Sequence, residues 1–205
     1  MLDGLDAINW AELTHAYGDA TDVPGLLRSL LSADSKVREE TIYELFGNIW
    51  HQGTVYTASA AAVPFLYELL SAVGVEGKSD IAHLLACIAS GVGYLEVHAV
   101  DGFGVTTWRK ILGEEGKSLE HEMGREAAEI ASVRRAFSTG LHLLIPYLRD
   151  DAAEIREAVA TTLGRYPEHA YLTLPALETA ETVEEDEDVR EAMRASRVAL
   201  STHQS

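Results

Sequence analysis

The eight histidines are the side chains best suited to acid–base or metal chemistry near neutral pH. No two of them are three or four residues apart, which is the spacing that brings two imidazoles to one metal ion on a helix. The acidic neighbours in Glu120–Glu122 do not change this, because adjacent residues on a helix point in different directions. The pattern therefore predicts no metal site. The histidines are His15, His51, His83, His98, His121, His142, His169 and His203.

Motifs of known catalytic chemistry are also missing from the sequence. It contains no glycine-rich phosphate loop, no pair of cysteines, no His-Glu-x-x-His and no Gly-x-Ser-x-Gly. Carboxylates are abundant, but the sequence does not tell which two would lie close enough for acid–base catalysis. The sequence therefore favours a protein without catalytic residues and without a cofactor.

The segment 50–56, Trp-His-Gln-Gly-Thr-Val-Tyr, places two aromatic rings, an imidazole and an amide in one predicted turn. One interpretation is a recognition site in which Trp50 or Tyr56 anchors a partner and His51 and Gln52 make polar contacts. The other is that the two aromatic residues pack one helix pair on the next, while His51 or Gln52 caps a helix. The sequence leaves both open.

Residues 91–117 are rich in glycine and predict an irregular insertion with one short helix near Thr107–Leu112. Long loops inside a domain are uncommon and often functional, and a flexible loop with anchoring aromatics is the alternative. The candidate binding residues here are Tyr94, His98, Phe103 and Trp108.

The helices that position these residues are indicated by two short sequence motifs, or phrases, that recur along the chain. Four of the five prolines lie in the phrase apolar-Pro-x-Leu, at intervals of 40, 82 and 29 residues. An Arg-Glu phrase follows three of them. A repeat of about 40 residues with two helices in each unit is typical of armadillo and HEAT arrays. The prolines are Pro24, Pro64, Pro146 and Pro175, and the arginines of the second phrase are Arg38, Arg156 and Arg190.

These phrases resemble the HEAT-like repeats of bacterial proteins, including those related to phycobilin-lyase repeats. In that family, Pro and Leu mark the first helix, and Asp-x-x-Val-Arg-x-x-Ala opens the second. Residues 34–38 and 186–190 match the first half of that motif, and residues 155–158 match it without the Asp. The resemblance implies an all-α, right-handed α-α superhelix of antiparallel helix pairs, forming a single domain over 1–205. Residues 184–205 would be the capping helix and tail.

Two arginines of the second phrase have a predicted structural role. On a helical wheel Arg38 lies beside Ile42 and Leu45, and Arg156 lies beside Ala160. An arginine placed in this way lays its aliphatic stem on the core and needs an acceptor for its head. We therefore assign both, with Asp34 as a helix cap, to contacts between repeats.

Composition limits the classes of partner. The 205 residues carry a formal net charge of −17, which repels nucleic acid and anionic membranes, so neither DNA nor a membrane is an expected partner. No apolar run is long enough to cross a bilayer, and the N-terminal residues do not look like a signal peptide. The single cysteine, Cys87, fits a reducing compartment, so we expect a cytoplasmic protein.

The sequence thus favours a binding scaffold that recognises a basic protein partner on its concave face, for example as an immunity or antitoxin-like inhibitor. The alternative is a HEAT-like protein that binds a small ligand or chromophore, or acts as a lyase, through the aromatic insertion. A nucleic-acid enzyme is not expected, because the chain has 16 basic against 33 acidic residues. A homo-oligomer formed through the repeat ends is a third reading.

Overall fold

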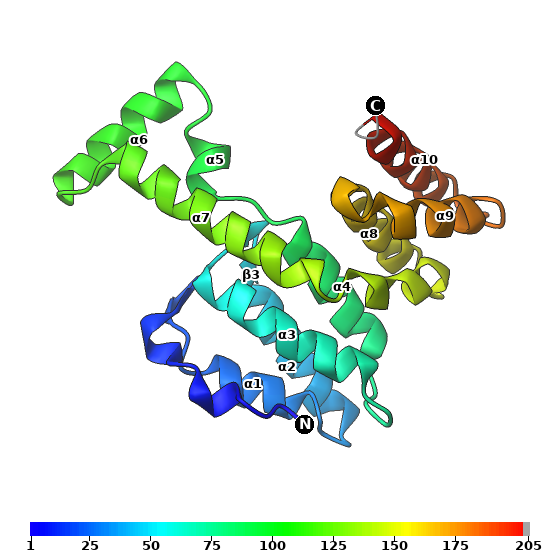
Figure 1. Ribbon diagram of the computed structural model, residues 1–205. Coiled ribbons are helices and arrows are strands. Elements are labelled where there is room, and N and C mark those ends of the chain that lie inside the picture. The colour runs from blue at the N-terminus through cyan, green and yellow to red at the C-terminus, as the bar shows by residue number, and fades with distance from the viewer. Residues whose placement is uncertain (203–205) are drawn as a thin grey trace.

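The computed structural model describes residues 1–202 and is predominantly helical (Figure 1). Four helix pairs follow one another, and within each pair the two helices pack together. Each repeated proline lies in the first helix of a pair, so the predicted all-α helical-repeat fold is confirmed. The first helices are α1 (Val23–Ser29), α3 (Thr57–Ser71), the 3-10 helix η3 (Leu141–Arg149) and α9 (Ala170–Glu181), and the second are α2 (Ser35–Asn48), α4 (Lys78–Ala89), α8 (Ala153–Gly164) and α10 (Glu187–Thr202).

Short elements complete the N-terminal half. The 3-10 helices η1 (Leu5–Ala7) and η2 (Trp10–Glu12) precede a hairpin of β1 (Thr14–His15) and β2 (Gly18–Asp19). A second antiparallel hairpin joins the first two helix pairs. Its strands are β3 (Trp50–His51) and β4 (Thr54–Val55), and Trp50 pairs with Val55. A last short helix, η4 (Pro167–His169), precedes α9.

The segment 91–117 is largely helical, so the prediction of an irregular insertion is wrong over most of its length. It contains α5 (Tyr94–His98) and α6 (Gly102–Glu114). The Asp101 carboxylate caps α6 by accepting a hydrogen bond from the Gly104 N–H at 2.7 Å. A Cβ on Gly104 would lie 2.5 Å from the His98 carbonyl oxygen. This glycine therefore permits a tight approach between two helices, where the sequence suggested a loop.

These two helices and the first part of α7 (Leu119–Ser138) form an arm, defined here as residues 94–126, that projects from the helix pairs (Figure 1). The arm has a small apolar core of its own, separate from the main core. The remainder of α7 packs against α3 and α4. The buried residues of the arm core are Leu95, Ala99, Leu112 and Leu119.

One continuous main core links both ends of the repeat array, from Leu2 to Leu200. Helix α3 lies at its centre, and nine of its fifteen residues are buried. A helix that is apolar around most of its circumference has to be covered on several sides. Helices α1, α4 and α7 all pack against it. No helix in the described part of the chain is long and apolar enough to cross a membrane.

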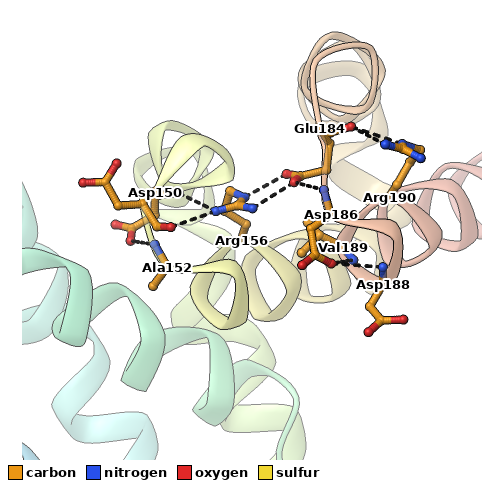
Figure 2. Close-up of polar contacts among 9 residues, drawn as sticks. Asp150, Ala152, Arg156, Glu184, Asp186, Asp188, Val189 and Arg190 are labelled. Atoms are coloured by element: carbon orange, nitrogen blue, oxygen red, sulfur yellow. Dashed lines mark hydrogen bonds and ion pairs between the residues drawn. The ribbon is translucent and has the colours of Figure 1, made fainter.

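The two repeat arginines join neighbouring elements. Arg156 on α8 forms a bidentate ion pair with Glu184, which lies between α9 and α10 (Figure 2). Both hydrogen bonds measure 2.8 Å, and the Arg156 head also donates to the Asp150 and Asp151 carbonyls. Glu184 in turn accepts from the Asp186 N–H at 3.0 Å, just before α10 begins. The arginine therefore ties the turn inside one helix pair, between η3 and α8, to the turn inside the next pair, between α9 and α10.

Arg38 occupies the equivalent place at the start of α2. It donates to the Ser32 carbonyl at 2.7 Å and pairs with Glu76, in the turn between α3 and α4, at 2.7 Å. Asp34 caps α2 by accepting from the Lys36 N–H at 3.0 Å.

Replacing Arg156 with Leu should cost about 3–5 kcal/mol, because Glu184 would remain buried without its counter-charge. The side chain of Glu184 is only 5% exposed. The control is Arg28→Leu, since the Arg28–Asp6 pair is largely exposed and should be worth about 1 kcal/mol or less. Urea unfolding measures both, and equal losses would contradict the structural role of Arg156.

Two glycines make a matched pair for testing the helix packing. A Cβ on Gly164, at the end of α8, would lie 2.5 Å from the Ser196 side chain and 2.8 Å from its Cα on α10. Gly164→Ala should therefore destabilise the chain by about 1–3 kcal/mol through overpacking. Gly124 on α7 has open space around it, and Gly124→Ala should stabilise by about 0.5–1 kcal/mol. Thermal unfolding of both variants gives the comparison, and a neutral Gly164→Ala would rule out this close α8–α10 contact.

Candidate binding site

The hairpin at residues 50–55 is a tight turn held in place by the segment that leads into the arm. Gln52 and Gly53 have φ values of 51° and 90°, the left-handed geometry that a two-residue hairpin turn requires. Val92 accepts a hydrogen bond from the Val55 N–H at 3.2 Å and donates to the Gly53 carbonyl at 2.8 Å. The predicted turn is therefore rigid, and it is joined directly to the start of α5.

The N-terminal hairpin lies beside this turn. The Ala16 N–H donates to the Asn48 carbonyl at 3.0 Å, and the rings of Tyr17 and His51 meet edge to face at 5.5 Å. His15 is buried, with its Nε2 atom 2.9 Å from Asp22 and its Nδ1 atom accepting from the Tyr17 N–H at 3.0 Å. These contacts hold Tyr17 at the surface, where it is 69% exposed. The sequence did not indicate this neighbour of His51.

The residues of the predicted recognition turn separate onto different faces. Trp50 packs against Phe46 at 5.8 Å, and Phe46 packs against His83 of α4 at 5.4 Å. Trp50 therefore follows the packing interpretation. Gln52 is exposed, and His51 stays near the surface beside Tyr17.

Tyr56 is half-buried at the start of α3. Burial raises its pKa, and the nearby groups Tyr17, Glu126, Glu129 and Tyr94 raise it further.

The aromatic residues of the arm are brought together only in part. Tyr94 stacks on His98 at 4.3 Å and meets Trp108 edge to face at 5.3 Å. Trp108 also packs against the arm core. Phe103 is 81% exposed on α6 and is not part of this contact. Tyr94, at the base of the arm, is thus the aromatic residue of the arm that comes near Tyr56.

Two buried glutamates on α7 complete the site. Glu126 and Glu129 are 8% and 7% exposed, and burial raises the pKa of both carboxyls. Glu126 accepts a hydrogen bond from the Leu95 N–H at 2.9 Å. Glu129 pairs with Arg125, which also pairs with Glu122 at 2.9 Å.

Sequence reasoning missed these carboxylates, although one signal was available. Glu126 falls in register with the apolar stripe of α7, at spacings of three and four residues. The members of that stripe are Leu119, Met123, Ile130, Val133 and Phe137.

Residues of the η2–β1 segment, α3 and α7 line a groove of about 710 Å³, which we call the N-terminal groove. Its floor is made of small residues where α3 and α7 pack together, including Ala60, Ala61 and Ala128. Its charged residues are Glu12 from η2, Glu129 from α7, and Arg125, which pairs with Glu129. A cleft of this size with an apolar floor and a few charged groups is the usual form of a binding site.

The groups expected for metal or thiol chemistry do not assemble in the described part of the chain. Residues 1–202 contain no cluster of three or more His, Cys, Asp or Glu side chains that could hold a metal ion. His203 lies outside the described residues. Burial raises the pKa of the Cys87 thiol to about 11, so the thiol is protonated and unreactive at neutral pH.

Comparison with known proteins does not place the chain in a family. No protein-family model and no curated protein matches it. Among solved structures it is similar to a crystal structure described as an engineered protein. The identity is 22% and the TM-score 0.39, over 88% of this chain and 80% of that one. A likeness at this level carries no argument about function, so function has to be inferred from the groove itself.

Glu126→Gln and Glu126→Ala should separate two roles of this carboxylate, its hydrogen bond to the Leu95 N–H and its contribution to the pH dependence of stability. Gln retains an acceptor for the Leu95 N–H, whereas Ala leaves that N–H unpaired, so Ala should be less stable than Gln by about 1–3 kcal/mol. A carboxyl with a raised folded-state pKa contributes stability that is fully present below its unfolded pKa and lost as the pH rises through its folded pKa. Gln should remove that part of the pH dependence. Urea unfolding from pH 4 to pH 7 tests this, and equal losses in both variants would exclude the hydrogen-bonding role.

Proposed function

We propose that this chain is a non-enzymatic binding protein of the HEAT-like kind that holds a basic segment of a partner protein in the N-terminal groove. The observation that carries the proposal is the groove itself, with alanines along its floor and two carboxylates, Glu12 and Glu129, against one cation, Arg125. Such a groove suits an amphipathic segment whose apolar face lies on the floor while its Lys or Arg side chains reach the acids.

Electrostatics favours a cationic occupant. The chain carries a formal net charge of −17, which attracts a basic partner over long range. Close to the groove, Glu126 and Glu129 are removed from water, and their raised pKa values reflect the cost of their charge. A cation brought next to them would offset that cost, so binding would lower both pKa values and release protons. Affinity should therefore rise with pH through the range in which these carboxyls titrate.

The surface next to the groove can enlarge the contact. A stable protein interface buries about 800 Å² on each partner, more than a single groove supplies. Tyr17 and Tyr94 are 69% and 43% exposed, and both lie near Tyr56. Tyrosine is enriched among the residues that dominate binding energy, because it offers a large contact area at low entropic cost. An inhibitor that covers a basic nuclease surface would be one protein of this class.

The test uses two variants with the same change in net charge. Glu12→Gln combined with Glu129→Gln alters the groove, and Glu114→Gln combined with Glu115→Gln alters the exposed end of α6. The probe is an amphipathic helical peptide of leucine and lysine, titrated by fluorescence anisotropy at low and at high salt. The groove variant should bind about tenfold more weakly, and the arm variant should bind like the wild type.

Equal weakening of the two variants would show that net charge alone attracts the peptide, and the groove assignment would then be wrong. An isosteric peptide with glutamate in place of lysine serves as the charge control. If that acidic peptide bound equally well, the basic partner class would be excluded.

A further inference from the structure

A second pocket lies where the two halves of the repeat array meet, away from the N-terminal groove. It has a volume of about 370 Å³ and is bordered by the ends of α4 and α8, by α7 and by η4. It shares no lining residue with the N-terminal groove. Apolar side chains form much of its wall, and two guanidinium groups and a phenol supply its polarity. The residues that matter for its chemistry are Ile130, Val133, Arg134, Arg165 and Tyr166.

Tyr166 brings a phenol to this pocket. The residue is 1% exposed, and its ring packs against Phe137 at 6.2 Å. Its hydroxyl makes no hydrogen bond within residues 1–202 and is not among the fully buried unpaired atoms of these residues, so the oxygen is not sealed in the core. Burial raises the pKa of the phenol, so the hydroxyl stays protonated at neutral pH. It is therefore a donor that the folded chain leaves available.

Arg134 is held firmly beside this tyrosine. Its guanidinium carbon lies 4.7 Å from the centre of the Tyr166 ring. It donates to the Arg165 carbonyl at 2.9 Å and to the Glu168 carboxylate at 2.7 Å. These contacts satisfy much of its hydrogen-bonding capacity and fix the backbone at Arg165. We therefore regard Arg134 as a positioning residue for the pocket.

Arg165 differs from most cations of this acidic chain. Across the described residues it forms no ion pair, and its guanidinium makes one hydrogen bond, to the Ser90 carbonyl at 3.4 Å. A guanidinium has five N–H donors in a planar fork, so several remain for a ligand. Both arginines act on the Tyr166 phenol electrostatically, which places the two positive charges and the free hydroxyl in one neighbourhood.

We propose that this pocket binds a small organic carboxylate. Its carboxylate would accept hydrogen bonds from the Arg165 guanidinium and the Tyr166 hydroxyl, and its apolar body would lie against Ile130 and Val133. The planar fork of arginine matches a carboxylate, and a volume of this size fits a small ligand. Large polyanions are disfavoured by the net charge of −17. This site is independent of partner binding at the N-terminal groove.

Benzoate is the probe, titrated into the full chain by calorimetry, with benzamide as its neutral counterpart. Arg165→Gln should weaken benzoate binding by about tenfold or more, because a charge-assisted hydrogen bond is lost. Tyr166→Phe should weaken it several-fold without lowering the unfolding temperature, because the hydroxyl has no partner in the folded chain. The matched control is Arg149→Gln, which removes another exposed arginine without an ion pair in the described residues and should leave binding unchanged.

Three results would overturn the proposal. Benzamide could bind as tightly as benzoate, which would exclude recognition of the charge. Arg165→Gln and Arg149→Gln could have equal effects, which would reduce the interaction to general charge. Benzoate could fail to saturate the chain at millimolar concentration, which would leave the pocket without a carboxylate site.

Discussion

The burial of α3 is the constraint on which the rest of the structure depends. Nine of its fifteen residues lie in the core, so no single neighbouring helix can cover it. Its own partner, α4, covers one side, and α7 is drawn onto another. Because α7 also extends into the arm, the same packing positions Tyr94 and takes Glu126 and Glu129 out of water. The N-terminal groove follows from this arrangement, since its alanine floor is the place where α3 and α7 meet.

Regular packing and binding chemistry are divided between different parts of the chain. The repeated arginines connect helix pairs, and Arg156 shows how one side chain can join two turns by contacts to Glu184 in one and to Asp150 and Asp151 in the other. Features that depart from the repeat carry the candidate chemistry. They are the two hairpins, the arm and α7, and of these the first hairpin, the arm and α7 contribute residues to the N-terminal groove. The pocket lined by Arg165 and Tyr166 lies near the C-terminal end of α7, where the series of helix pairs continues with η3 and α8.

The sequence predicted what local patterns determine and missed what long-range packing decides. The proline and arginine phrases identified the helix pairs because each phrase acts within about one helix. The glycines predict an irregular insertion over 91–117 because glycine usually breaks helices, whereas Gly104 allows α5 and α6 to approach closely. Glu126 was overlooked because a glutamate on a helix is usually solvated, and only the contact of α7 with its neighbours buries it. The sequence leaves open whether Trp50 anchors a partner or packs between helix pairs, because the contact of its neighbour Phe46 with His83 of α4 is a long-range one.

The central claim is that packing on α3 holds the Glu126 and Glu129 carboxylates of α7 away from water. A cation bound next to them would then offset the cost of their negative charge. The most direct measurement is a carbon-13 NMR titration of the Glu126 and Glu129 side-chain carboxyls in the free protein. Both should titrate above the ordinary glutamate value of 4.5. If Glu126 and Glu129 titrated at or below that value, they would be well solvated or already neutralised, and the account of the groove would be wrong.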